Sequence, residues 1–196
     1  YKPLLAANTD IEKLILLSNN ISQTIKALRA NKYDMIIDLH NNLRSFRIRK
    51  ALNTQSFTVS KYSLKRFILI YFGVDLLKNH IVDRYFETVK SIGVYNDNEG
   101  ISYTLNPTTK VDFNINQDYI AWVIGGSYET KKLSRKQIED VISKLDIPVV
   151  LIGGTSENEI ADLIINSLFD KKIYNFCGMI SLDQSALLIK HSKLVL

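Results

Sequence analysis

Apolar stretches that look like strands alternate with amphipathic stretches along most of the chain, and two of the apolar stretches end in the same way. One covers residues 119–124 and runs into Gly125-Gly126-Ser127, and the other covers 148–152 and runs into Gly153-Gly154-Thr155. Each is typical of a buried strand that turns into a helix. Parallel strands end at a common edge of a sheet, so we expect both turns at the edge where open α/β sheets bind ligands.

The second half of the chain is predicted to continue this alternation. Three Ser-x-x-Glu/Gln motifs, each typical of a capping box, predict helices that begin at Ser134, Ser156 and Ser181. Short strands are expected at 173–176 and at 193–196. The resulting order of strands and helices is that of a Rossmann-like half domain.

The first half shows the same kind of alternation. Strands are predicted at 13–17, 33–39 and 57–59, the second of them buried, and helices are predicted at 21–30, 43–52, 63–72 and 80–92. From residue 96 the pattern weakens into Asn, Asp, Thr, Gly and Pro, with one short strand expected at 101–105. We place a domain boundary near Asn106-Pro107. The predicted fold is α/β, with two Rossmann-like parallel-sheet domains at 1–106 and 107–196, each incomplete in the sequence given.

Composition fits a globular protein with an uneven charge. Hydrophobic residues make up 46% of the 196 residues, and the longest apolar run, Phe67 to Val74, is shorter than the roughly 20 residues of a membrane span. The net charge is +5, and the first half carries a basic segment from Arg44 to Lys50. Such a surface suits nucleic acid, an acidic membrane surface or an anionic substrate. The single cysteine, Cys177, rules out an intramolecular disulfide and is expected in the core.

The two glycine turns form the first candidate site. Gly125-Gly126-Ser127 lets the backbone approach a ligand closely, and the helix that follows presents N–H groups to phosphate. Either Lys131 or Lys132 could contact a diphosphate there. In the second turn, Glu157 and Glu159 either interact favourably with the helix dipole, or one of them accepts hydrogen bonds from ribose hydroxyls. A tight turn with solvated lysines is the structural alternative.

The segment that follows the strand at 33–39 forms a second candidate site. Polar residues from Asp38 to Asn42 lead into Arg44, at the end of the strand where ligands bind. Arg44 and Arg47 could hold an anionic acceptor through paired hydrogen bonds. An Asn-rich turn followed by a solvated basic helix is the alternative.

Several motifs that would indicate other chemistries are missing. Neither glycine turn has the G-x-G-x-x-G spacing of a dinucleotide site, and the chain has no G-x-x-x-x-G-K-[ST] loop and no G-x-S-x-G elbow. The three histidines are isolated, without the spacing of metal ligands. These absences disfavour nicotinamide oxidoreductases, P-loop NTPases and triad hydrolases, and no cofactor or metal is predicted.

The residues of both candidate sites resemble glycosyltransferase family 9, the ADP-heptose:lipopolysaccharide heptosyltransferases. The run from Tyr33 to Ser45 resembles the strand and basic helix of that family, and His80 to Tyr85 resembles its counterpart. Gly125 to Ser134, Val149 to Gly154 and Asn175 to Leu182 follow the family's donor domain in the same order.

The resemblance implies a GT-B architecture and an inverting glycosyltransferase. Such an enzyme moves a heptose-like sugar from a nucleotide diphosphate of the ADP-heptose type to an anionic lipopolysaccharide core acceptor. The family usually has a hydroxyl residue where this chain has Gly126, and its catalytic Asp would precede Tyr1, so no base is assigned here. The resemblance implies donor contacts at Ser127, Lys131 and Glu157, so with the turn glycines the predicted donor-binding residues are Gly125, Gly126, Ser127, Lys131 and Glu157. The predicted acceptor-binding residues, from the segment after the strand at 33–39, are His40, Asn41, Arg44 and Arg47.

The expected setting is cytoplasmic, with peripheral contact between the basic first domain and the anionic inner leaflet of the inner membrane. Another GT-B enzyme, such as a nucleotide-sugar epimerase, is the alternative within enzymes. A basic nucleic-acid-binding module is the alternative from a different class, although the chain lacks a reader motif, and nucleic acid is not among the expected partners. A catalytically inactive family member with a scaffolding role is a third.

Overall fold

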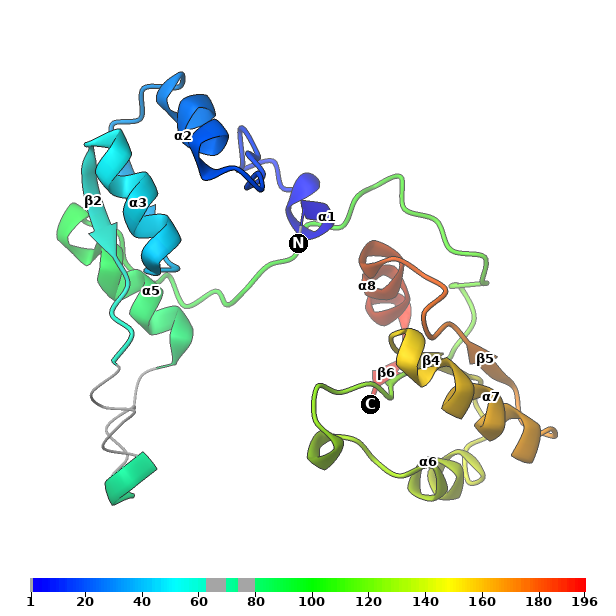
Figure 1. Ribbon diagram of the computed structural model, residues 1–196. Helices are drawn as coiled ribbons and strands as arrows, with labels where there is room; N and C mark the ends of the chain where they lie inside the picture. The colour runs from blue at the N-terminus through cyan, green and yellow to red at the C-terminus, as the bar shows by residue number, and fades with distance from the viewer. Residues whose placement is uncertain (1, 63–69, 74–79) are drawn as a thin grey trace. The chain divides into compact units, whose positions relative to one another are not determined.

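The computed structural model describes residues 2–62, 70–73 and 80–196, which divide into two compact units (Figure 1). The N-terminal unit is Lys13–Ser102, and the C-terminal unit joins Tyr1–Glu12 to Tyr103–Leu196. The division therefore falls at 102–103, beside the boundary proposed at 106–107, and the first twelve residues cluster with the C-terminal unit. They do so because the short helix α1 (Lys2–Ala6) contacts α8 (Leu182–His191).

The C-terminal unit is built on a four-stranded parallel sheet. Its strands are β3 (Ile120–Val123), β4 (Val149–Ile152), β5 (Ile173–Asn175) and β6 (Leu194–Val195), in the order β5-β4-β3-β6. Three helices make the crossovers: α6 (Arg135–Ile142), α7 (Asn158–Ser167) and α8. The chain moves outward from β3 to β5 and then returns to the other side of β3, so the sheet has a topological switch point between β3 and β6. Each strand lies within a stretch where the sequence predicts a strand.

Successive residues of a strand point to opposite faces of the sheet, and helices cover both faces. On one face, Trp122 and Leu151 pack with α6 and α7, which lie beside each other (Figure 1). On the other face, Ala121 and Val150 pack with α8, and the buried Tyr119 donates a hydrogen bond to the carbonyl oxygen of Leu188 at 2.6 Å. Cys177 is buried in the first of these clusters, which confirms the prediction that it lies in the core.

The N-terminal unit contains a parallel pair of strands, β1 (Met35–Asp38) and β2 (Gln55–Thr58), joined through α3 (Leu43–Leu52). The helix predicted at 43–52 is therefore confirmed. It contacts α2 (Ile21–Arg29), and α5 (Ile81–Val89) contacts β2 before a short 3-10 turn, η1 (Lys90–Ile92). Within the described residues, no helix has the length and apolar character needed to span a bilayer.

Four predictions for this half of the chain are wrong or fall outside the described residues. Residues 13–17 and 101–105 form no strand, because neither segment pairs with a neighbouring strand. The strand predicted as buried is exposed on one side, because the alternate residues Met35 and Ile37 share a face that stays open to solvent, at 44% and 45% of their full accessibility. The helix predicted at 63–72 lies mostly outside the described residues.

The helix starts confirm two of the three predicted capping boxes. Ser134 caps α6 with Gln137, and Ser181 caps α8 with Gln184. The third box, between Ser156 and Glu159, is wrong. A 3-10 turn, η3 (Thr155–Glu157), follows Gly154 as its N-cap instead and leads into α7. The hydroxyl of Ser156 donates to the neighbouring carboxylate of Glu157, so it does not cap a helix.

Two leucines of the C-terminal unit offer a matched test of its core. Leu151 in β4 is fully buried, whereas Leu163 on α7 is 43% exposed. We expect Leu151→Ala to lower the free energy of unfolding by about 2–5 kcal/mol, and Leu163→Ala to change it by less than about 1 kcal/mol. Fluorescence of the single tryptophan, Trp122, during guanidinium unfolding measures both effects. Equal losses would contradict the assigned packing.

Candidate functional site

A cavity of about 710 Å³ opens at the carboxyl ends of β3 and β4, beside the switch point of the sheet. Both glycine turns line one side of it, together with Ser127 and Glu157. The other side is more apolar and comes from α8 and the loop before it, with Ile180, Leu182 and Ile189. A cavity with a polar rim of backbone N–H groups and an apolar wall suits a ligand that is charged at one end and flat and apolar at the other.

Glu157 lines the polar side of the cavity and is only 7% exposed. Its Oε2 accepts a hydrogen bond from the N–H of Gly154 at 2.9 Å, and its Oε1 accepts one from the hydroxyl of Ser156 at 2.9 Å. The ammonium of Lys132 lies 3.2 Å from the same Oε1. Burial alone would raise the pKa of Glu157, but the hydrogen bonds from Ser156, Lys132 and Gly154 hold it below its ordinary value.

The glycines of the two turns leave room for this carboxylate. A Cβ atom added at Gly153 would lie 2.8 Å from Cβ of Glu157, which is closer than non-bonded carbons approach. One added at Gly125 would lie 3.2 Å from Oε2. The sequence predicts that these glycines let backbone approach a ligand. The structure shows that the space beside both residues is filled by the side chain of Glu157.

The two adjacent lysines have different surroundings. Lys131 ends a 3-10 turn, η2 (Glu129–Lys131), and its exposed ammonium lies 5.5 Å from the centre of the Tyr128 ring. Lys132 is extended, with φ −108° and ψ 144°, and its ammonium lies 3.0 Å from Glu129 and 3.2 Å from Glu157. Of the five donor-binding residues that the resemblance implies, four line the cavity, and Lys131 is not among the lining residues.

Lys132 is a charged residue beside this site that the resemblance does not assign. The sequence does contain a signal for it, because two consecutive lysines follow the first glycine turn. The pattern does not distinguish between them, and the local backbone decides which one faces Glu157. The assignment of Lys131 to the donor phosphate stays a prediction.

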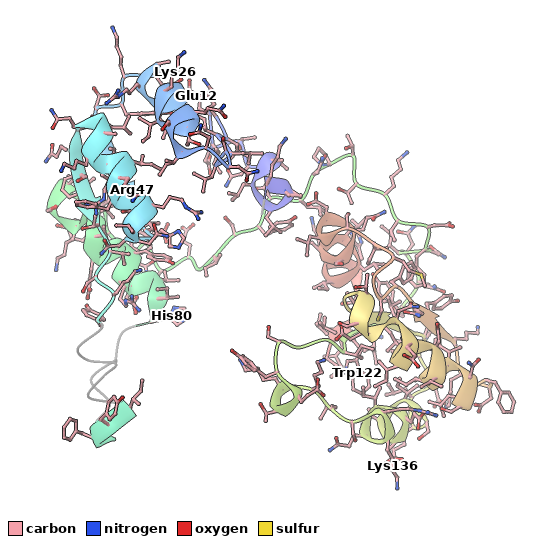
Figure 2. All side chains as sticks on the ribbon, in the orientation of Figure 1. Glu12, Lys26, Arg47, His80, Trp122 and Lys136 are labelled. Atoms are coloured by element: carbon pink, nitrogen blue, oxygen red, sulfur yellow. The ribbon has the colours of Figure 1, made fainter. Side chains whose placement is uncertain are left out.

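A second cavity, of about 450 Å³, lies in the N-terminal unit at the start of α3. Arg44 and Arg47 both line it, and Figure 2 shows Arg47 on this helix. Asn19, Ile21, Asn42 and Leu43 complete the lining. Two exposed guanidinium groups on one helix suit a carboxylate or a phosphate. His40 and Asn41, the other predicted acceptor residues, belong to the loop that precedes the helix and do not line the cavity.

That loop is held by the buried carboxylate of Asp38, which is 6% exposed. Its Oδ1 accepts hydrogen bonds from the backbone N–H groups of His40 at 3.0 Å and Asn41 at 2.7 Å. Its Oδ2 lies 2.9 Å from Nε of Arg49, forming an ion pair whose angles depart from those of a hydrogen bond. Burial would raise the pKa of Asp38, but the hydrogen bonds from Asn41, Ser45 and His40 and the charge of Arg49 lower it.

The side chains of His40 and Asn41 serve this loop as well. Asn41 adopts a left-handed conformation with φ 45°, and its side-chain amide donates to the carbonyl oxygen of Val59 at 2.8 Å. Nε2 of His40 lies 3.2 Å from Nδ2 of Asn42. Asn41 is therefore engaged in holding the loop against the end of β2, and the arginines are the predicted acceptor residues that line the cavity.

The sheet order defines a Rossmann-like unit, with a cavity at the switch point where such sheets bind ligands. The sequence then identifies the family, because residues 21–196 match the model of glycosyltransferase family 9 (heptosyltransferase). The chain belongs to glycosyltransferase family 9. No curated protein sequence matches it at a significant level.

Solved structures share its fold at low sequence identity. The ADP-heptose lps heptosyltransferase II of E. coli is 17% identical with a TM-score of 0.72, over 99% of this chain and 66% of that one. The glycosyl transferase family 9 protein of Veillonella parvula DSM 2008 is 19% identical with a TM-score of 0.76, over 98% and 62%. E. coli heptosyltransferase WaaC with ADP-2-deoxy-2-fluoro heptose is 15% identical with a TM-score of 0.60, over 89% and 58%.

These similarities confirm the predicted α/β fold class with Rossmann-like parallel sheets of the GT-B type. The chain spans between 58% and 66% of the length of the three solved proteins. The whole protein's activity and substrates are therefore matters for proposal and experiment.

The second glycine turn provides a test of the Glu157 arrangement. Gly153→Ala places a methyl group against Cβ of Glu157 and within 3.1 Å of Sγ of Cys177, so the carboxylate must move. We expect it to lower the free energy of unfolding by about 1–3 kcal/mol. Gly154→Ala is the comparison, because its Cβ would come no closer than 3.2 Å to Oε2 of Glu157 and 3.8 Å to the hydroxyl of Ser156, so we expect a smaller loss. Trp122 fluorescence reports both, and equal costs would refute the close fit at Gly153.

The Asp38 network predicts a pH-dependent contribution to the stability of the N-terminal unit. Asp38→Asn removes the charge and keeps the shape, and we expect a loss of about 1–3 kcal/mol at pH 7. The folded-state pKa of Asp38 is lowered, so its stabilisation is complete above about pH 4 and is lost as the pH falls through the lowered value. The difference between variant and wild type should therefore shrink in acid.

The measurement compares two signals in one urea titration. Far-UV circular dichroism follows both units, whereas Trp122 fluorescence follows the C-terminal unit and should not change. A shift of the Trp122 transition, or a difference that grows as the pH falls, would contradict the role given to Asp38.

Proposed function

We propose that this chain is the donor- and acceptor-binding part of an inverting glycosyltransferase. It would move a heptose-like sugar from an ADP-heptose type donor to an anionic lipopolysaccharide core acceptor. Family membership supports glycosyl transfer, and two of the structural relatives are named for ADP-heptose or a fluorinated analogue of it. The observation that carries the proposal is the cavity at the switch point, whose polar turns face an apolar wall.

In this proposal the C-terminal unit binds the nucleotide diphosphate. The N–H groups of the first glycine turn, the hydroxyl of Ser127 and the ammonium of Lys131 would contact the diphosphate. The apolar wall of Ile180, Leu182 and Ile189 would take the flat face of the base. Glu157 already accepts three hydrogen bonds of the roughly four that a carboxylate can take, so about one site is left for a ribose hydroxyl.

The transfer step is a single displacement. An acceptor hydroxyl oxygen forms a bond to the anomeric carbon as the bond from that carbon to the diphosphate oxygen breaks on the opposite face. A general base takes the hydroxyl proton, and the family resemblance places that base, an Asp, before Tyr1. Lys131 and the turn N–H groups stabilise the charge that develops on the departing diphosphate. We assign no metal and no cofactor to this step.

The N-terminal unit is proposed to hold the acceptor. Arg44 and Arg47 line a cavity with exposed guanidinium groups, which suit the phosphates and carboxylates of a lipopolysaccharide core. The same basic surface would favour peripheral contact with the anionic inner face of the inner membrane, in a cytoplasmic setting.

Binding of ADP to this chain, measured by isothermal titration calorimetry, tests the donor site. We expect saturable binding that is weaker for AMP, because AMP lacks the second phosphate. Lys131→Met should weaken ADP binding by about tenfold, the effect of removing one charged contact to phosphate. Lys136→Met is the matched control, since Lys136 is exposed on α6 away from the cavity lining (Figure 2). Absence of binding, or equal affinity for AMP and ADP, would contradict the proposal.

A further inference from the structure

Lys132 connects the two glycine turns of the C-terminal unit. It leaves the loop after β3, and its ammonium reaches Oε1 of Glu157 in the loop after β4 at 3.2 Å. The lysine side chain is 24% exposed, and that of Glu157 is 9% exposed. Its second partner, Glu129, lies at 3.0 Å and is open to solvent. Of the two carboxylates, Glu157 depends more on a fixed cation, because a buried charge without a partner is costly.

Gly126 provides the space for the lysine stem. A Cβ atom added at Gly126 would lie 3.3 Å from Cγ of Lys132 and 3.5 Å from the carbonyl oxygen of Lys131. A residue with a side chain here would push the stem of Lys132 and, through it, the ammonium. Gly126 thus stands beside the partly buried stem of Lys132. The two features are sterically linked.

We propose that Lys132 is a positioning residue of the donor site, which orients the carboxylate of Glu157 for a ribose hydroxyl, and that Gly126 makes room for it. This inference rests on the proposed function, because it gives Glu157 a ligand to contact. With Lys132 on Oε1 and Gly154 N–H on Oε2, the carboxylate has one orientation and a single open acceptor position. Lys131 remains the lysine available to the diphosphate.

The charged groups around Glu157 define the expected pH behaviour. Lys132 faces it from the loop after β3, with Glu129 on the far side of the ammonium. Cys177 faces it from the loop after β5, and burial raises the pKa of that thiol to about 12, so the thiol stays neutral. Asp162 on α7 also lies near Cys177. Lys132 is thus the cation that favours the ionised form of Glu157, and its removal should raise the pKa of Glu157.

The first experiment needs no ligand. The carboxyl carbon of Glu157, assigned by its absence in Glu157→Gln, is titrated by NMR in ¹³C-glutamate-labelled protein. We expect Glu157 to titrate at a higher pH in Lys132→Met than in wild type, and Lys132→Arg to restore the lower value, because arginine keeps the charge. Trp122 fluorescence checks that each variant is folded. An unchanged Glu157 titration in Lys132→Met would overturn the inference.

The second experiment measures ADP affinity in a double-mutant cycle. Lys132→Met and Gly126→Ser should each weaken ADP binding by about five- to tenfold, and the double variant should lose little more than either alone, because both act through the same ammonium. The midpoint of the acid-side loss of ADP affinity should also move to higher pH in Lys132→Met. Additive losses would overturn the link between Gly126 and Lys132. A wild type that fails to bind ADP would refute the proposed function, while the NMR titration would still test Lys132.

Discussion

The candidate donor site depends on the interactions of one buried carboxylate, that of Glu157. The parallel sheet brings the ends of β3 and β4 to one edge, and Glu157 then joins the turns that follow them. Such a charge is tolerated only where hydrogen bonds and a cation replace water. Gly154 and Ser156 supply the hydrogen bonds and Lys132 supplies the cation, while Gly153 supplies the space. The two glycine turns are thus shaped around the side chain of Glu157, independently of any ligand.

The N-terminal unit also contains a buried carboxylate, but its partners all lie close to it in the sequence. Asp38 ends β1, is buried, accepts hydrogen bonds from the next loop and pairs with Arg49 on the helix that follows. Its partners all come from one strand–loop–helix segment, so it fixes a single loop, the one that leads into Arg44. Glu157 takes its cation from the neighbouring loop and therefore couples two segments. Both carboxylates have lowered pKa values because their hydrogen bonds and charges outweigh burial.

The predictions that depend on local residue patterns are confirmed. The helix at 43–52, the strands that precede the glycine turns and the capping boxes at Ser134 and Ser181 all follow from residue spacing, and the structure confirms them. The predictions failed where contacts that residue spacing does not describe decide the outcome. Residues 13–17 have strand-like composition but no neighbouring strand to pair with, and Ser156 is drawn to the carboxylate of Glu157 instead of capping a helix. Spacing alone contains neither piece of information.

The consecutive lysines show why the site could be located from the sequence but not assigned in detail. Lys131 closes a 3-10 turn, and the chain becomes extended at Lys132, where adjacent side chains point in opposite directions. One ammonium therefore lies in solvent over Tyr128, and the other lies between two carboxylates. An ammonium already shared by two anions is a poor choice for a phosphate, whereas a solvated one is free to move toward it. The backbone change between these two residues thus separates the cation that supports Glu157 from the cation available to a diphosphate.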